Sequence, residues 1–180
     1  MPTELRIIVR ILAVCTLIAG STAVSAEEPD LKTPSPFIYL ADNLDEKDKL
    51  GWCIDTLGRG YAEKIQAHSC KPRGGDVQFD FNEKTRAIES VAFAGKCLTL
   101  VDQSDPKIPF GLRDCKTGET SQMFDFNFQS MQIRPESDKS LCLAVAPDSR
   151  SAGPFMSRDL TLAPCDGTEP RLVQWKRQTN

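Results

Sequence analysis

The sequence has a single histidine, His68, and its seven cysteines form no C-x-x-C motif. A Ser-His-Asp catalytic triad or a histidine-rich zinc site therefore has little to build on, because both need imidazoles at defined positions. The wide spacing of the cysteines favours disulfides over metal binding. Acidic residues are plentiful, but no pattern orients the matched acid and base that glycoside hydrolysis requires. We expect no catalytic residues, no metal site and no cofactor.

Long apolar runs and basic stretches are missing as well. The hydrophobic stretch at residues 11–19 is too short to span a bilayer and continues into Gly, Ser and Thr, so we expect no membrane span. The chain has 22 Lys and Arg against 25 Asp and Glu, a formal net charge of −3. Without a basic stripe, nucleic acid is not an expected partner.

Residues 1–26 have the features of a signal peptide: a basic start at Arg6 and Arg10, a short apolar run and small residues at the end. Cleavage after residue 26 would remove Cys15 and leave six cysteines, an even number that is typical of disulfides in exported proteins. We expect a secreted or periplasmic protein that begins at Glu27. Cys15 and the three residues before it also resemble a lipoprotein box, so lipidation of Cys15 is an alternative.

The remainder shows short apolar runs and no sustained helical periodicity. Residues 27–36 are charged and proline-rich, and we expect a flexible linker there. From Phe37 onward, apolar or alternating runs are separated by Gly, Pro, Asp and Asn, which is the pattern of short β-strands. The expected strands are 37–41, 51–56, 63–67, 77–82, 87–92, 96–101, 109–113, 122–127, 131–134, 141–145, 159–163 and 173–177.

Three series of marker residues recur at a spacing of about 45 residues. A first cysteine recurs after 44 and 45 residues, a second after 45 and 50, and an aromatic residue after 45 and 51. The three sets are Cys53, Cys70 and Phe79; Cys97, Cys115 and Phe124; and Cys142, Cys165 and Trp175. A shared register in three series indicates a threefold repeat. Three repeats of four strands fit an all-β fold, the β-trefoil, in which a six-stranded barrel is capped by three hairpins.

The repeat also selects one disulfide pairing among the many that six cysteines allow. Equivalent repeats should carry equivalent bonds, so we expect Cys53–Cys70, Cys97–Cys115 and Cys142–Cys165. Each bond would contribute on the order of 3 kcal/mol in the chain-entropy picture. The aromatic residue of each repeat is expected to fill the core.

These repeats resemble the ricin B-chain-type β-trefoil carbohydrate-binding domain, whose repeat contains G-x-C-L-D-V and, later, Q-x-W. The matching stretches here are Gly51-Trp52-Cys53-Ile54-Asp55, Gly95-Lys96-Cys97-Leu98-Thr99 and Ser140-Leu141-Cys142-Leu143-Ala144. The Q-x-W motif appears as Gln122-Met123-Phe124, whereas valine replaces the glutamine in the other two repeats. The resemblance covers residues 37–180 as one domain.

The resemblance implies a shallow sugar site, and the first repeat has most of its parts. In the family, an aspartate follows the first cysteine, a glutamine and an aromatic residue precede the second, and an Asn or Asp lies near Q-x-W. Asp55, Gln66, His68 and Asp76 take these positions. Such a mixture suits a pyranose, which has an apolar face and a rim of hydroxyls. The imidazole of His68 would be a smaller stacking platform than Trp or Tyr.

The other two repeats depart from this set. The second repeat has Thr99 in place of the aspartate and Arg113 in place of the aromatic residue, and the third repeat has Ala144 and Ala163. By the family's pattern these repeats are structural. We therefore expect any sugar site to lie in the first repeat.

The expected function is that of an exported, non-enzymatic lectin-like module that binds a glycan through the first repeat. The alternative is a protein-interaction trefoil, or a toxin-accessory or adhesion subunit, that binds no sugar. The chain is similar in size to the trefoil accessory subunits of bacterial toxins such as cytolethal distending toxin. Asp55 also has a simpler interpretation, as an acceptor in a turn or cap.

Overall fold

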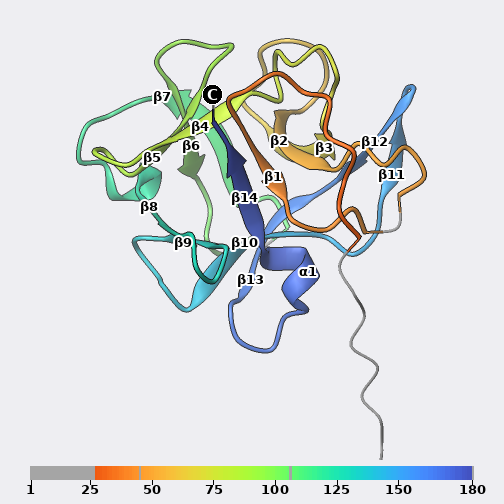
Figure 1. Cartoon of the computed structure of the whole chain (residues 1–180). Coiled ribbons are helices and arrows are strands. Elements are labelled where there is room, and N and C mark those ends of the chain that lie inside the picture. The colour runs from red at the N-terminus through yellow and green to blue at the C-terminus, as the bar shows by residue number, and fades with distance from the viewer. Residues whose placement is uncertain (1–26, 45, 106, 180) are drawn as a thin grey trace, which may run out of the picture.

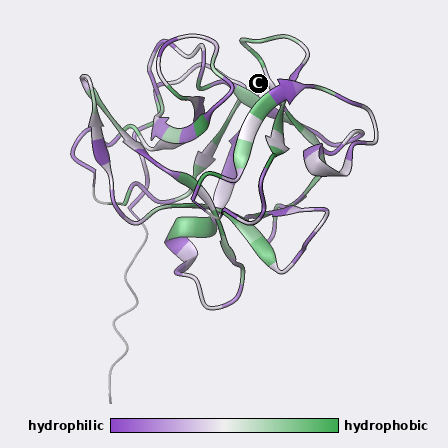
Figure 2. Cartoon of the chain, turned by 180° about the vertical axis from the view of Figure 1, so that it is seen from behind, coloured by the Kyte–Doolittle hydropathy of each residue, from purple (hydrophilic) through white to green (hydrophobic). Residues whose placement is uncertain are grey.

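The computed structural model describes residues 27–44, 46–105 and 107–179 (Figure 1). The expected signal peptide at residues 1–26, with Cys15, lies outside the described residues. The described chain is almost entirely β-structure, with one short 3₁₀ helix, η1 (Thr120–Gln122), and one short helix, α1 (Pro170–Val173). Figure 2 shows hydrophobic residues on the strands and on α1, and many hydrophilic residues on the connecting loops.

Six strands pair across the repeats as the barrel of a β-trefoil. The first strand of the chain pairs with the last, and the other four form two antiparallel pairs. The pairs are β1 (Phe37–Leu40) with β14 (Trp175–Gln178), β4 (Phe79–Asn82) with β5 (Ala87–Ser90), and β8 (Phe124–Asn127) with β9 (Gln132–Pro135). Each of the last two pairs joins the end of one repeat to the start of the next. The predicted β-trefoil is confirmed.

Each repeat also contributes one hairpin, and a disulfide closes its open end. The hairpins are β2 (Trp52–Thr56) with β3 (Ile65–Ser69), β6 (Lys96–Leu100) with β7 (Phe110–Asp114), and β10 (Leu141–Val145) with β13 (Leu160–Pro164). The disulfides are Cys53–Cys70, Cys97–Cys115 and Cys142–Cys165. The expectation of one disulfide inside each repeat is confirmed.

The barrel is filled by the repeated aromatic residues. Phe79, Phe124 and Trp175 are each 0% exposed and belong to one continuous core cluster. The indole Nε1 of Trp175 donates to the carbonyl of Leu143 at 2.9 Å, so its polar atom is satisfied. Burying such a side chain stabilises the fold by about 2–3 kcal/mol.

A second hairpin in the third repeat has no expected counterpart. Its strands are β11 (Arg150–Ala152) and β12 (Phe155–Arg158), which pair with each other. The cysteines of the third repeat are 23 residues apart, against 17 and 18 in the others, and the extra length lies in this hairpin. β12 pairs with β3 of the first repeat, which brings two distant parts of the chain together.

Residues 27–36 differ from the flexible linker that we expected. The Thr33 side chain is buried and donates a hydrogen bond to the carbonyl of Lys71 at 2.9 Å. Asp30 N–H donates to the carbonyl of Lys49 at 2.6 Å, and Gln78 Nε2 donates to the carbonyl of Pro34 at 2.9 Å. Polar and proline-rich composition predicts a linker only when the backbone has no partner, and here the domain supplies several.

Candidate functional site

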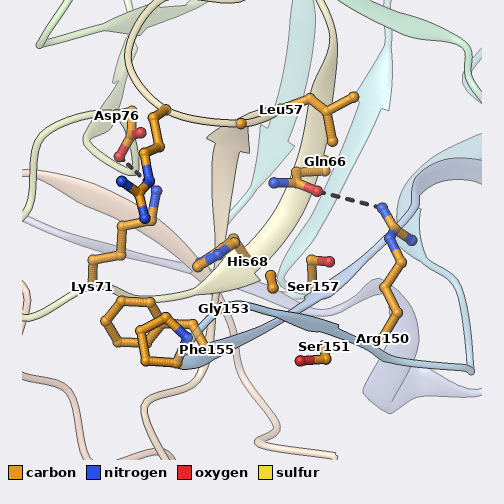
Figure 3. A pocket seen from close by; sticks show the side chains of 14 residues that line it. Leu57, Gln66, His68, Lys71, Asp76, Arg150, Ser151, Gly153, Phe155 and Ser157 are labelled. Carbon is orange, nitrogen blue, oxygen red and sulfur yellow. Dashed lines mark hydrogen bonds and ion pairs between the residues drawn. The ribbon is translucent and has the colours of Figure 1, made fainter.

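A cavity lies between the β2–β3 hairpin of the first repeat and the β11–β12 hairpin of the third. Its volume is about 580 Å³. This is within the usual range of small-molecule sites. Gln66, His68 and Asp76 line it, together with residues of β11, β12 and the loop after β2 (Figure 3).

Strand register explains why the predicted residues meet. Gln66 and His68 are two apart on β3, so their side chains leave the same face of the strand. Asp55 on β2 lies directly across from Gln66 in the antiparallel pair. Directly opposed residues share a face, so Asp55 joins the same cluster. Asp76 reaches it from the chain that follows β3, beyond Cys70.

Asp55 lies beneath the cavity rather than in its wall. It is 0% exposed, and its carboxylate accepts hydrogen bonds from Lys71 Nζ at 3.1 and 3.3 Å and from Gln66 Nε2 at 3.4 Å. Burial raises the pKa of Asp55 to about 7, although the positive charge of Lys71 acts in the opposite direction. Direct contact between Asp55 and a sugar hydroxyl would require Lys71 to move.

Lys71 joins the two carboxylates of the predicted site. Its ammonium also contacts Asp76 Oδ1 at 2.7 Å, as Figure 3 shows. The Lys71 side chain is 17% exposed and lines the cavity. Sequence reasoning missed Lys71, and the available signal was its place directly after Cys70, between the glutamine and the late aspartate.

His68 presents an acceptor rather than an open stacking face. Its Nδ1 lies 3.0 Å from the carbonyl oxygen of Ser69. A carbonyl can only accept, so Nδ1 carries the proton and Nε2 is left as an acceptor. Burial lowers the pKa of His68, which favours this neutral form. Only 4% of His68 is exposed, and its ring packs against Phe155 in a T-shaped contact with 5.6 Å between ring centroids.

The β11–β12 hairpin is held firmly against the first repeat. The guanidinium of Arg158 is ion-paired with Glu46 at 2.8 Å and lies over the Trp52 ring, 4.5 Å from its centroid. Met156 N–H donates to Ser69 Oγ at 3.0 Å. The hairpin therefore forms a fixed wall of the cavity. Sequence reasoning had placed no strand there.

The second repeat has a hollow at the equivalent position, but its polar groups are used internally. Gln122 Nε2 donates to Thr99 Oγ1 at 3.0 Å and to the carbonyl of Asp114 at 2.8 Å, while its Oε1 accepts from Lys116 N–H at 2.7 Å. The hollow has a volume of about 520 Å³. Arg113 on its rim is ion-paired with Glu63 at 2.5 Å.

In the third repeat, alanines replace the aspartate and the imidazole, and Thr161 takes the position of Gln66. The Thr161 hydroxyl donates to the carbonyl of Ala144 at 3.3 Å. Ala144 is 1% exposed and packs with the disulfide of its repeat, and Ala163 is half-buried beside it. Among the described residues, the carboxylate and imidazole of the first repeat thus have no counterpart at these strand positions of the third repeat.

Neither a metal centre nor a membrane helix is found in the described part of the chain. Within residues 27–44, 46–105 and 107–179, no three His, Cys, Asp or Glu side chains gather as a metal site would require. No helix in these ranges is long and apolar enough to cross a bilayer.

Two solved structures resemble this chain in fold. The β-trefoil lectin of Vibrio vulnificus hemolysin/cytolysin with N-acetyl-D-lactosamine bound has a TM-score of 0.52 at 15% identity, covering 82% of this chain and 97% of the lectin. GalNAc-T7 with UDP, GalNAc and Mn²⁺ has a TM-score of 0.51 at 18% identity and matches 71% of this chain. The match spans only 20% of the GalNAc-T7 chain. A search of curated proteins finds no match.

The sequence itself matches one family model. The model of the ricin-type beta-trefoil lectin domain matches residues 41–124 and, in a second overlapping alignment, residues 87–180. Together the two matches include all three disulfides and all three repeated aromatic residues. The repeats, the trefoil and this match agree: the chain belongs to the ricin-type β-trefoil lectin domain family.

Proposed function

We propose that this protein is a glycan-binding module whose site is the cavity of the first repeat. The observation that carries the proposal is the convergence of Gln66, His68, Lys71 and Asp76 on one cavity. The second repeat has Thr99 and Arg113 in place of the aspartate and the imidazole, and the third has alanines there. A ring of hydroxyls needs such closely placed donors and acceptors.

Each of these groups has a distinct capacity. Lys71 offers ammonium donors, the neutral His68 offers Nε2 as an acceptor, and Asp76 offers carboxylate oxygens. Asp55 acts from below by fixing Lys71, to which it is bonded at 3.1 Å. The assignment of Asp55 as a binding residue thus becomes one of positioning, with direct contact available only if Lys71 withdraws.

The affinity of one such site should be low. A single cavity with few charge-assisted contacts corresponds to about −4 to −6 kcal/mol, which is a millimolar to high-micromolar dissociation constant. Tight attachment would then need several copies of the protein on one glycan surface.

Binding without hydrolysis and export from the cell are part of the same proposal. Asp55 is 0% exposed beneath the cavity and Asp76 is ion-paired with Lys71, so the two carboxyl groups do not flank a bound sugar as a matched acid and base would. Three disulfides suit an oxidising compartment, and the features of residues 1–26 suit secretion or transfer to the periplasm.

A glycan array probed with residues 27–180 tests the proposal. Asp76→Ala removes a charged acceptor from the cavity and should weaken binding by about 1.5–3 kcal/mol, roughly tenfold to a hundredfold. Ser121→Ala is the matched control, since Ser121 stands 45 residues later, in the hollow of the second repeat. Equal binding by Asp76→Ala and wild type would exclude this cavity. A blank array at high protein density would instead favour a protein partner.

A further inference from the structure

The cavity is shared between two repeats, and only one of them carries the family's predicted residues. The β11–β12 hairpin contributes Arg150, Ser151, Phe155 and Ser157 to its lining. Ser157 lies directly opposite His68 in the β12–β3 pair. The part of the cavity lining that lies beside β3 is thus a property of the longer third repeat.

Phe155 is the aromatic ring best placed to meet a sugar. It is half-buried and lines the cavity, whereas His68 is only 4% exposed. The contact with His68, at 5.6 Å between ring centroids, fixes the position of the phenyl ring. Rigid aromatic rings with one free face are suited to the apolar face of a pyranose.

The charged groups around the cavity are mainly cationic. Lys71, Arg59 and Arg150 line it together with the carboxylate of Asp76. Lys71 lies between Asp76 at 2.7 Å and the buried Asp55 at 3.1 Å, so Arg59 and Arg150 are the cations that remain for an anion. Arg59 is exposed and has no side-chain ion pair or hydrogen bond among the described residues. The guanidinium of Arg150 pairs with the exposed Asp159 at 2.7 Å, and its Nη2 donates to Gln66 Oε1 at 3.4 Å (Figure 3). This cationic rim contrasts with a chain in which acidic residues outnumber basic ones, 25 to 22.

We infer that the cavity recognises an acidic sugar, with the ring against Phe155 of the third repeat and the acid group facing Arg59 and Arg150. This inference rests on the proposed function and adds the ligand class and a platform from another repeat. Ions on a partly enclosed rim attract an anion more strongly than exposed pairs do, and salt weakens the attraction.

Equilibrium surface plasmon resonance on the immobilised 27–180 protein tests this with matched sugars. Methyl galactoside and methyl galacturonide differ only in CH₂OH against COO⁻, and the glucose pair repeats the comparison. We expect the acidic member of at least one pair to bind about tenfold more tightly at low salt, and the advantage to shrink in 0.5 M NaCl, roughly as the screening length falls. Arg59→Gln should remove most of this preference and leave the neutral sugar unaffected.

Phe155→Ala should weaken both members of the pair by about tenfold. Phe128→Ala is the control, because Phe128 is 53% exposed and does not line the cavity. If Phe155→Ala folds poorly, Phe155→Leu keeps an apolar side chain without the ring and should show most of the loss.

Three results separate the possibilities. Unchanged binding by a folded Phe155→Ala or Phe155→Leu overturns the platform, and equal affinity for acidic and neutral sugars overturns the ligand class. In both cases the proposed function survives, because wild type still binds. If wild type binds neither these sugars nor any glycan on the array, the proposed function itself is overturned.

Discussion

Replacing Asp55 by asparagine should remove a loss of stability that the protein suffers as the pH rises. Burial raises the pKa of Asp55 to about 7, above the value of about 3.9 for an aspartate in an unfolded chain. The native state therefore binds this proton more tightly than the unfolded state does. The resulting stability is complete below about pH 4 and is lost as the pH rises through 7.

The size of the effect follows from the shift. A difference of about three pKa units corresponds to at most about 4 kcal/mol between pH 4 and pH 8. The Asp55 carboxylate is 0% exposed, but its partner Lys71 is 17% exposed, so water screens part of the charge. We expect about 2 kcal/mol, which is a large fraction of the stability of a domain of this size.

Urea unfolding of wild type and of Asp55→Asn, with the disulfides intact, measures this pH-dependent difference in unfolding free energy at half-unit steps from pH 4.5 to 8. The other titrating groups are common to both proteins, so the difference between the two unfolding free energies isolates residue 55. Relative to wild type, the asparagine variant should gain stability as the pH rises. Asp125→Asn is the control, since Asp125 is half-buried on β8 and its side chain has no ion pair among the described residues. A flat difference, or one that favours wild type at high pH, would show that Lys71 outweighs burial and that our reasoning is wrong.

Two further substitutions test the packing around the site. Lys71→Met leaves the buried charge of Asp55 without its cation, and should lower the free energy of unfolding by about 3 kcal/mol at pH 8 and by less at pH 5, where the carboxyl is protonated. In urea unfolding, adding Asp55→Asn to this variant should restore most of the loss. Equal losses at pH 5 and pH 8 would contradict this prediction. Gly51→Ala should cost more than Gly95→Ala by about 1–3 kcal/mol. Both glycines have φ +75°, but an added Cβ at Gly51 would lie 2.7 Å from Pro29 Cβ, whereas Gly95 has open space. Equal melting-temperature losses in the two variants would mean that residues 27–36 are not packed as described.

Much of the fold follows from the sequence because the same pattern of cysteines, aromatic residues and short apolar runs occurs in all three repeats. Every expected strand overlaps an observed one, and the pairing of the cysteines follows from their register. The β11–β12 hairpin could not be anticipated, because residues 146–154 are rich in Pro, Gly, Ser and Asp and have no apolar alternation. β11 pairs with β12, and β12 pairs with β3, a partner more than 80 residues away.

The sequence also predicted part of the candidate site. Family spacing located Gln66, His68 and Asp76 at one cavity, and it located Asp55 at the same cluster but not its complete burial. Lys71 was missed because a lysine in a polar turn is usually solvated, and only the fold brings it within 3.1 Å of Asp55. Phe155 was missed because it belongs to another repeat. Local sequence specifies which residues share a strand face, whereas contacts between repeats depend on the assembled trefoil.

The most direct test of glycan binding in the first repeat is an NMR titration of ¹⁵N-labelled 27–180 protein with the strongest array glycan. Amide shifts should change around Arg59, Gln66, His68 and residues 150–157, and should stay constant around Thr99 and Gln122. Shift changes centred on the second-repeat hollow, or dispersed over the surface with no change at the first-repeat cavity, would contradict the account.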